Sequence, residues 1–107
     1  MPDDTTLTDA ELNEMERRAA AAAPAPWIAF MESRFGTGGA SMIQVGQPSD
    51  VDDEIYVRRC IGSKQLASPN EQLDADIDFI AAARQDVPRL IAEVRRLRAV
   101  MAEAPHR

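Results

Sequence analysis

Apolar residues at helical spacing predict a helix near the start of the chain. Four of them recur at intervals of three and four residues and therefore share one side of a helix: Leu12, Met15, Ala19 and Ala22. Thr8 stands three residues before Glu11, which is the spacing of a reciprocal capping box. We predict a tail that frays over residues 1–6 and a helix over residues 8–23, which Pro24 ends.

The hydrophobic period changes after the first helix. Residues 27–35, 41–45 and 54–61 are short stretches that contain β-branched and aromatic residues, and turn-forming segments separate them. Such connections favour antiparallel neighbours. The pattern predicts a three-stranded antiparallel meander over residues 27–61, followed by a loop from Gly62 to Ala67.

The rest of the chain has a helical pattern with one interruption. Ser68-Pro-Asn-Glu71 combines a preferred N-cap, a proline at the first helical position and a glutamate three residues after the cap. We predict a helical region over residues 68–103 that Pro88 breaks near residues 86–88. A seam with alternating three- and four-residue spacing follows, and it can pack on the sheet or on its copy in another subunit: Val87, Leu90, Val94, Leu97 and Met101.

These elements indicate an α+β fold in a single small domain, residues 1–107: an N-terminal helix, a three-stranded antiparallel meander and a broken C-terminal helix pair packed on one face. A chain of 107 residues buries only about two-thirds of its unfolded surface. An interface between subunits would add burial, so we expect a homo-oligomer built from dimers.

Composition and charge narrow the classes of function. The chain is 45% hydrophobic and 28% charged, as in soluble globular proteins, so we expect neither disorder nor a membrane partner. Eighteen acids against 12 bases give a net charge of −6, which disfavours nucleic acid as a partner. One cysteine, and acidic residues soon after Met1, point to the reducing cytoplasm.

Catalytic and metal-binding patterns are weak. The one histidine, His106, lies next to the terminal Arg107, which disfavours a Ser-His mechanism, and ligands for zinc are lacking. Residues 74–78 open like a calcium loop, but Phe79 stands where glycine is needed. Cys60 is expected to be buried in a strand and inert. We expect no enzyme, no cofactor and no metal, with a metal-dependent hydrolase that uses carboxylates as an alternative.

The best candidate site follows from strand direction. In a meander, the end of the first strand, the first connection and the end of the third strand share one end of the sheet. Glycine-rich backbone N–H groups can form an anion nest, and arginine forks match phosphate. Tyr56 could stack on a base, as could Trp27, although Trp27 begins the first strand at the opposite end. The alternative is that the hairpin is only a turn. The candidate ligand-binding residues are Arg34, Gly36, Thr37, Gly38, Gly39, Ser41, Arg58 and Arg59.

The last helix is basic, which raises a second possibility. Five arginines could contact DNA, or they could form a solvated face that pairs with acidic helices: Arg89, Arg95, Arg96, Arg98 and Arg107. The alternatives to a ligand-binding function are therefore a DNA-associated regulatory module or a protein-interaction module.

Two segments resemble a known group of proteins. One is the Ala-Pro-Ala-Pro-Trp that ends at Trp27, and the other is residues 75–88, Ala-Asp-Ile-Asp-Phe-Ile-Ala-Ala-Ala-Arg-Gln-Asp-Val-Pro. They are similar to the Pro-x-Pro-Trp and Ala-Asp-x-x-Phe-Ile-Ala-x-Ala-Arg-x-Asp-Val-Pro patterns of Ead-like small accessory proteins of phages, prophages and actinobacterial mobile elements. The resemblance implies an accessory gene product but carries no chemistry. We therefore expect a non-catalytic oligomeric protein that binds either a small anionic, nucleotide-type ligand, in counter-defence, or a host protein.

Overall fold

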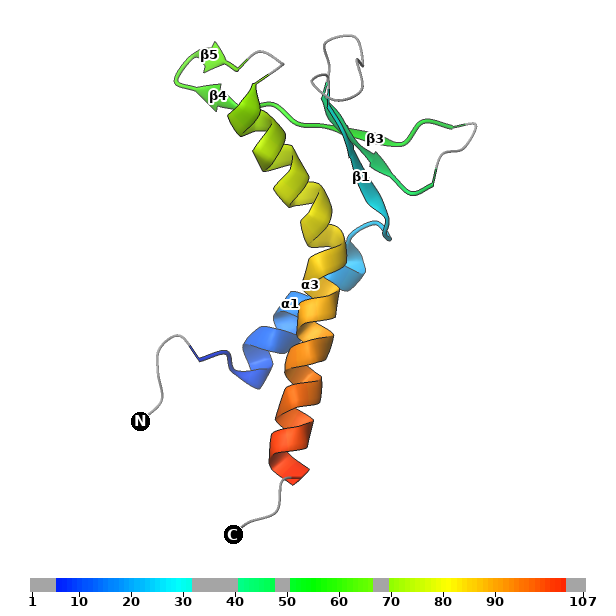
Figure 1. The fold of residues 1–107 in the computed structure, drawn as a ribbon, viewed down its shortest axis with the longest axis vertical. Helices are drawn as coiled ribbons and strands as arrows, with labels where there is room; N and C mark the ends of the chain where they lie inside the picture. The colour runs from blue at the N-terminus through cyan, green and yellow to red at the C-terminus, as the bar shows by residue number, and fades with distance from the viewer. Residues whose placement is uncertain (1–5, 32–40, 48–50, 67–69, 104–107) are drawn as a thin grey trace. The chain divides into compact units, whose positions relative to one another are not determined.

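A computed structural model describes residues 6–31, 41–47, 51–66 and 70–103 and confirms the α+β fold (Figure 1). Its elements are α1 (Asp9–Ala21), β1 (Trp27–Phe30), β2 (Met42–Val45), β3 (Glu54–Tyr56), β4 (Cys60–Ile61), β5 (Lys64–Gln65) and α3 (Glu71–Glu103). Contacts divide the chain into two compact units, residues 1–22 with 86–107 and residues 23–85. Helix α3 runs through both units, so the division does not decide whether the chain folds as one domain. The single domain stays a prediction. Within the described ranges, no helix combines the length and the hydropathy of a membrane span.

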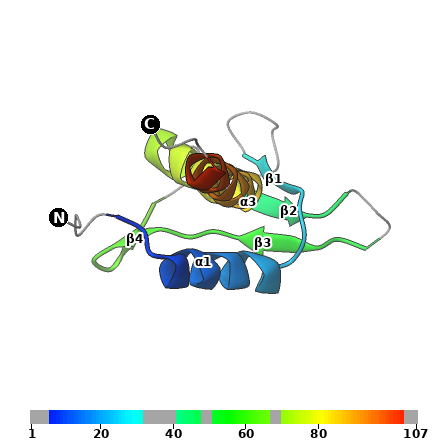
Figure 2. The same ribbon diagram turned by 90° about the horizontal axis from the view of Figure 1, so that it is seen from below.

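The three-stranded meander is confirmed. Strands β1, β2 and β3 lie side by side in that order, and both pairs are antiparallel (Figure 2). The third strand is shorter than predicted, because β3 ends at Tyr56 rather than at residue 61. Cys60–Ile61 pairs instead with Lys64–Gln65 in a separate hairpin. Gly62 supplies a positive φ of 64° at the turn of this hairpin, so a segment predicted to be a loop forms local strand pairs.

The inner face of the sheet packs on the first part of α3. The core cluster consists of Met31, Ile43, Leu73, Ile77 and Ala81. Ile43 lies on the central strand, and Ile77 lies one helical turn after Leu73. Alternate residues of a strand share one face, as do residues four apart on a helix, so these side chains form one core. Trp27, Ala29 and Val57 pack against this cluster. Residues 23–85 thus have their own core.

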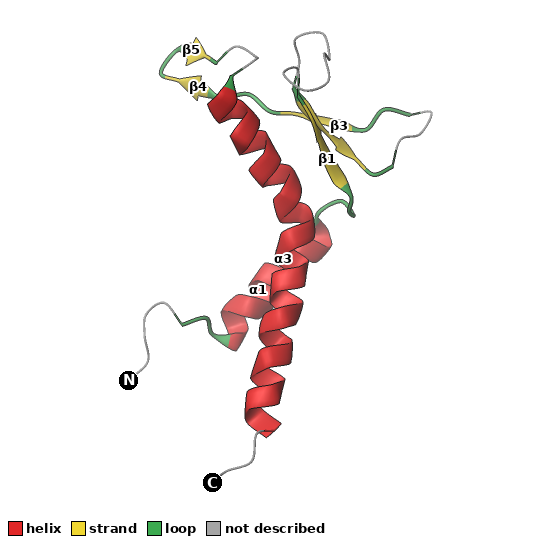
Figure 3. Ribbon diagram, viewed as in Figure 1, coloured by secondary structure: helices red, strands yellow, loops and turns green. Residues whose placement is uncertain are grey.

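The predicted break of the C-terminal helix is wrong. One helix, α3, runs from Glu71 to Glu103 with Pro88 inside it (Figure 3). A proline removes one backbone hydrogen bond, but alanine and arginine on both sides favour helix, and propagation is cooperative. The predicted cap Ser68 lies outside the described residues, and Asn70 caps the observed start by accepting the Leu73 N–H at 2.9 Å.

Helix α1 begins at the predicted capping box. Thr8 Oγ1 accepts from the Glu11 N–H at 3.0 Å, and Glu11 Oε1 accepts from the Thr8 N–H at 2.9 Å. α1 lies antiparallel to the second part of α3, since Arg98 donates to Asp9 near the start of α1 and Arg95 donates to Glu16 farther along it. Among the described residues of this unit, the buried large apolar side chains are Leu12 on α1 and Ile91 on α3.

Candidate functional site

The structure confirms the strand geometry on which the predicted site depends. Phe30 at the end of β1, Met42 at the start of β2 and Tyr56 at the end of β3 are paired, so they share one end of the sheet. Trp27 pairs with Val45 at the opposite end, as expected. Ser41 is buried just before β2. Five candidate residues lie outside the described residues, and their part in a site stays a prediction: Arg34, Gly36, Thr37, Gly38 and Gly39.

The two candidate arginines after β3 have different surroundings. Arg59 Nη1 donates to Asp76 Oδ2 on α3 at 2.8 Å, and Gln72 Nε2 donates to the other oxygen of Asp76 at 3.0 Å. The hydrogen bond from Gln72, followed by that from Arg59, holds the pKa of Asp76 below its ordinary value. Arg59 therefore ties the segment after β3 to the helix. Arg58 is exposed, and no ion pair joins it to another described residue.

The outer face of the sheet carries an apolar row that reasoning from the sequence missed. Ala29 and Ile43 face the core, and strand alternation therefore places the cross-strand row Phe30, Met42 and Tyr56 on the opposite face. Tyr56 is 59% exposed, while Phe30 and Met42 are half-buried. Alternation was visible in the sequence, but the register that aligns the three residues was not.

Tyr56 is held at one edge of this row by an acid. Its hydroxyl donates to Glu54 Oε1 at 2.8 Å, and both residues lie on the same face of β3. This hydrogen bond and the charge of Glu54, with a smaller contribution from Asp52, raise the pKa of Tyr56. The phenol therefore stays protonated throughout the neutral range.

Replacing Glu54 with glutamine should lower the pKa of Tyr56. Tyr56 is the one tyrosine in the chain, so tyrosinate absorbance during a pH titration reports it alone. We expect a midpoint above about pH 10 for the wild type and a midpoint near pH 10 for Glu54→Gln. A raised pKa means that this hydrogen bond stabilises the fold below about pH 10 and stops doing so as the pH rises through the folded-state value. Equal midpoints, with circular dichroism unchanged, would contradict the assigned cause.

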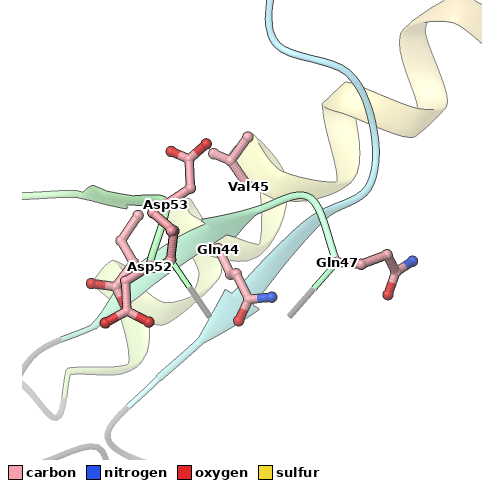
Figure 4. A pocket seen from close by; sticks show the side chains of 7 residues that line it. Gln44, Val45, Gln47, Asp52 and Asp53 are labelled. Atoms are coloured by element: carbon pink, nitrogen blue, oxygen red, sulfur yellow. The ribbon is translucent and has the colours of Figure 1, made fainter. Parts of the chain in front are cut away.

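A shallow pocket lies at the other end of the sheet, where β2 leads toward β3 (Figure 4). Its volume is about 70 Å³, room for very few water molecules, and its lining residues are Gln44, Val45, Gln47, Val51, Asp52, Asp53 and Glu54. The carboxylates disfavour an anion here. Within the described part of the chain, no group of three or more histidine, cysteine or acidic side chains could hold a metal ion.

Cys60 is exposed, so the expectation that it is buried is wrong. It lies on β4, in the short hairpin rather than in β3, and its neighbour Ile61 is also exposed. The physical reason is the early end of β3, which takes Cys60 out of the three-stranded sheet whose inner face is covered by α3.

Arginines of the last helix pair with acids. Arg98 Nη1 donates to Asp9 Oδ1 at 3.1 Å, Arg95 Nη2 donates to Glu16 Oε1 at 3.2 Å, and Arg96 Nη2 pairs with Glu93 at 2.7 Å. These pairs are at least one-third exposed and contribute little stability, but they neutralise much of the basic face. Pairing with acidic side chains was one of the two interpretations of these arginines, and DNA contact was the other. The pairing leaves less positive charge for contact with DNA.

Comparison of the chain with protein-family models, curated proteins and solved structures gave no match. The resemblance to Ead-like proteins therefore stays a prediction.

Proposed function

We propose that this chain is a non-catalytic, oligomeric binding protein that holds a small anionic, nucleotide-type ligand on the outer face of the β1–β3 sheet. The observation that carries the proposal is the row Phe30, Met42 and Tyr56 at one end of the sheet, with exposed Arg58 two residues after Tyr56. Aromatic side chains on a sheet provide a stacking surface for bases, and an arginine fork matches a phosphate.

The charges around the row give the ligand an orientation. Glu54 lies beside Tyr56 and repels a phosphate, so the phosphate belongs on the side of Arg58. Val57 packs against the core, which favours the outer side of the sheet for Arg58, the next residue. The base then lies over the aromatic row. The glycine-rich segment predicted to bind phosphate follows β1 in the sequence and lies outside the described residues.

The resemblance to Ead-like proteins supplies a setting for this activity. A phage or mobile-element accessory protein in the cytoplasm that sequesters a nucleotide signal would act in counter-defence. Native mass spectrometry of protein purified from cells would identify the ligand, because it reports a co-purified small molecule together with the number of subunits.

The arginine pair supplies a sharp test. We expect Arg58→Ala to weaken nucleotide binding at least about tenfold, because it removes a charged hydrogen bond to phosphate. Arg59→Ala is the matched comparison: it removes the same charge one residue later, but from a side chain already bound to Asp76. It should weaken binding by less than about threefold, because it loosens the segment that carries Arg58 without removing a contact to phosphate. Isothermal titration calorimetry with a mononucleotide, its nucleoside and inorganic phosphate separates base from phosphate recognition.

Three outcomes would overturn the proposal. One is the failure of wild-type protein to bind any nucleotide in a panel of linear and cyclic mono- and dinucleotides. The second is an equal loss of affinity in both arginine variants, which would indicate a general charge effect. The third is full affinity in Tyr56→Ala, because stacking on Tyr56 is then absent.

A further inference from the structure

Helix α3 exposes an apolar stripe in the unit formed by residues 1–22 and 86–107. Its members are Val87, Leu90, Val94, Leu97 and Met101, at alternating three- and four-residue spacing. Leu90 is 62% exposed, Leu97 is 46% exposed and Met101 is 75% exposed. Single exposed apolar residues are normal on a protein surface, but four exposed residues on one helical stripe, with half-buried Val94 among them, mark an interaction surface.

Helix α1 does not cover the stripe. α1 contacts α3 through Arg95 and Arg98, which lie on the same side of the helix as buried Ile91. At about 100° per residue, that side is rotated by about 90° from the centre of the stripe. A further helix can therefore lie along the stripe while α1 stays in place.

We propose that the stripe is the interface through which two copies of this chain pair, with their α3 helices parallel. In a heptad repeat the two core positions are called a and d. The a positions of the stripe hold Val87, Val94 and Met101, and its d positions hold Leu90 and Leu97. β-branched residues at position a with leucine at position d favour a parallel pair of helices over a bundle of three or four.

The exposed area of the stripe fits a second copy. The exposed parts of the stripe amount to roughly 400 Å² of apolar surface per copy. A standard interface buries about 800 Å² per partner, of which a little more than half is non-polar. The stripe alone thus supplies most of the apolar area that a stable dimer needs.

The inference rests on the oligomeric part of the proposed function, and sedimentation velocity over a range of concentrations tests it on the full chain. We expect a wild-type dimer and a Leu90→Glu monomer. Ala92→Glu is the matched control, because it places the same charge on the same helix but on the side away from the stripe, and it should stay dimeric. Leu90 is largely exposed, so its substitution leaves the buried core intact.

A wild-type monomer at all concentrations would overturn the inference, as would a dimer that persists in both Leu90→Glu and Leu97→Glu. Dissociation of Ala92→Glu to the same extent would also overturn it, because the stripe would then not be the interface. Nucleotide titration of the Leu90→Glu monomer keeps the two proposals distinguishable, since the sheet lies in residues 23–85 and its ligand can bind or fail to bind whatever the oligomeric state.

Discussion

Replacing Ile77 with alanine should lower the free energy of unfolding by about 2–5 kcal/mol. Ile77 lies on α3, and its side chain is fully buried against the sheet in a cluster with Ile43 and Met31. Truncation removes buried methyl groups and leaves a cavity that the paired strands cannot easily fill. Because a small domain has a total stability of only about 5–15 kcal/mol, a large fraction of the variant should be unfolded at modest denaturant concentrations.

Chemical denaturation followed by tryptophan fluorescence measures this loss. Trp27 is the one tryptophan in the chain, and it packs against the same core. Ile80→Ala is the matched control: it removes the same atoms from the same helix, but Ile80 is 39% exposed and should cost much less. An equal loss of unfolding free energy in both variants would contradict the placement of Ile77 in the buried core.

Replacing Gln85 with alanine should cost about 1–3 kcal/mol, because it leaves a part-buried backbone N–H without its partner. Gln85 Oε1 accepts from the Trp27 N–H at 2.9 Å. Its Nε2 donates to the Ala81 carbonyl at 3.1 Å and to the Trp27 carbonyl at 3.4 Å. One side-chain amide thus joins the first residue of β1 to α3.

Amide hydrogen exchange distinguishes this role from general destabilisation. In Gln85→Ala, the Trp27 amide should exchange much faster, while the amide of Ile43 on the central strand should change only as far as global stability falls. Gln72→Ala is the control for losing a glutamine from α3, since Gln72 is exposed and its side-chain amide donates to half-buried Asp76 rather than to a strand. Unchanged exchange at Trp27 would show that the Gln85 amide does not hold β1.

Local rules predicted those parts of the fold that depend on neighbours in the sequence. The Thr8 and Glu11 capping box closes over three residues, and the meander follows from alternation and short connections. The same local reasoning failed at Pro88, because the proline rule describes one lost bond, whereas the helix is favoured by the many residues on both sides. It failed again at residues 60–65, where the Gly62 turn forms its own hairpin.

The candidate site could be predicted only in part for the same reason. The sequence indicated that Arg58 lies near the end of the first strand. The strand pairing confirms that β1 and β3 both finish at the same end of the sheet. The sequence did not separate Arg58 from Arg59, because the partner of Arg59 is Asp76, which is 17 residues away on a different element. Nor did it identify Phe30 and Met42, whose alignment with Tyr56 depends on the register of three strands.

Under the proposed function, the tie between Arg59 and Asp76 would reduce the entropic cost of binding a phosphate at Arg58. A basic side chain on a loosely held segment must give up backbone freedom when it grips an anion, but a neighbour already anchored to a helix has lost that freedom during folding. The lowered pKa of Asp76 keeps the anchor charged from neutral pH down into the acid range, and it weakens only as the pH falls through that lowered value. The segment that carries Arg58 is therefore anchored at neutral pH, before any ligand arrives.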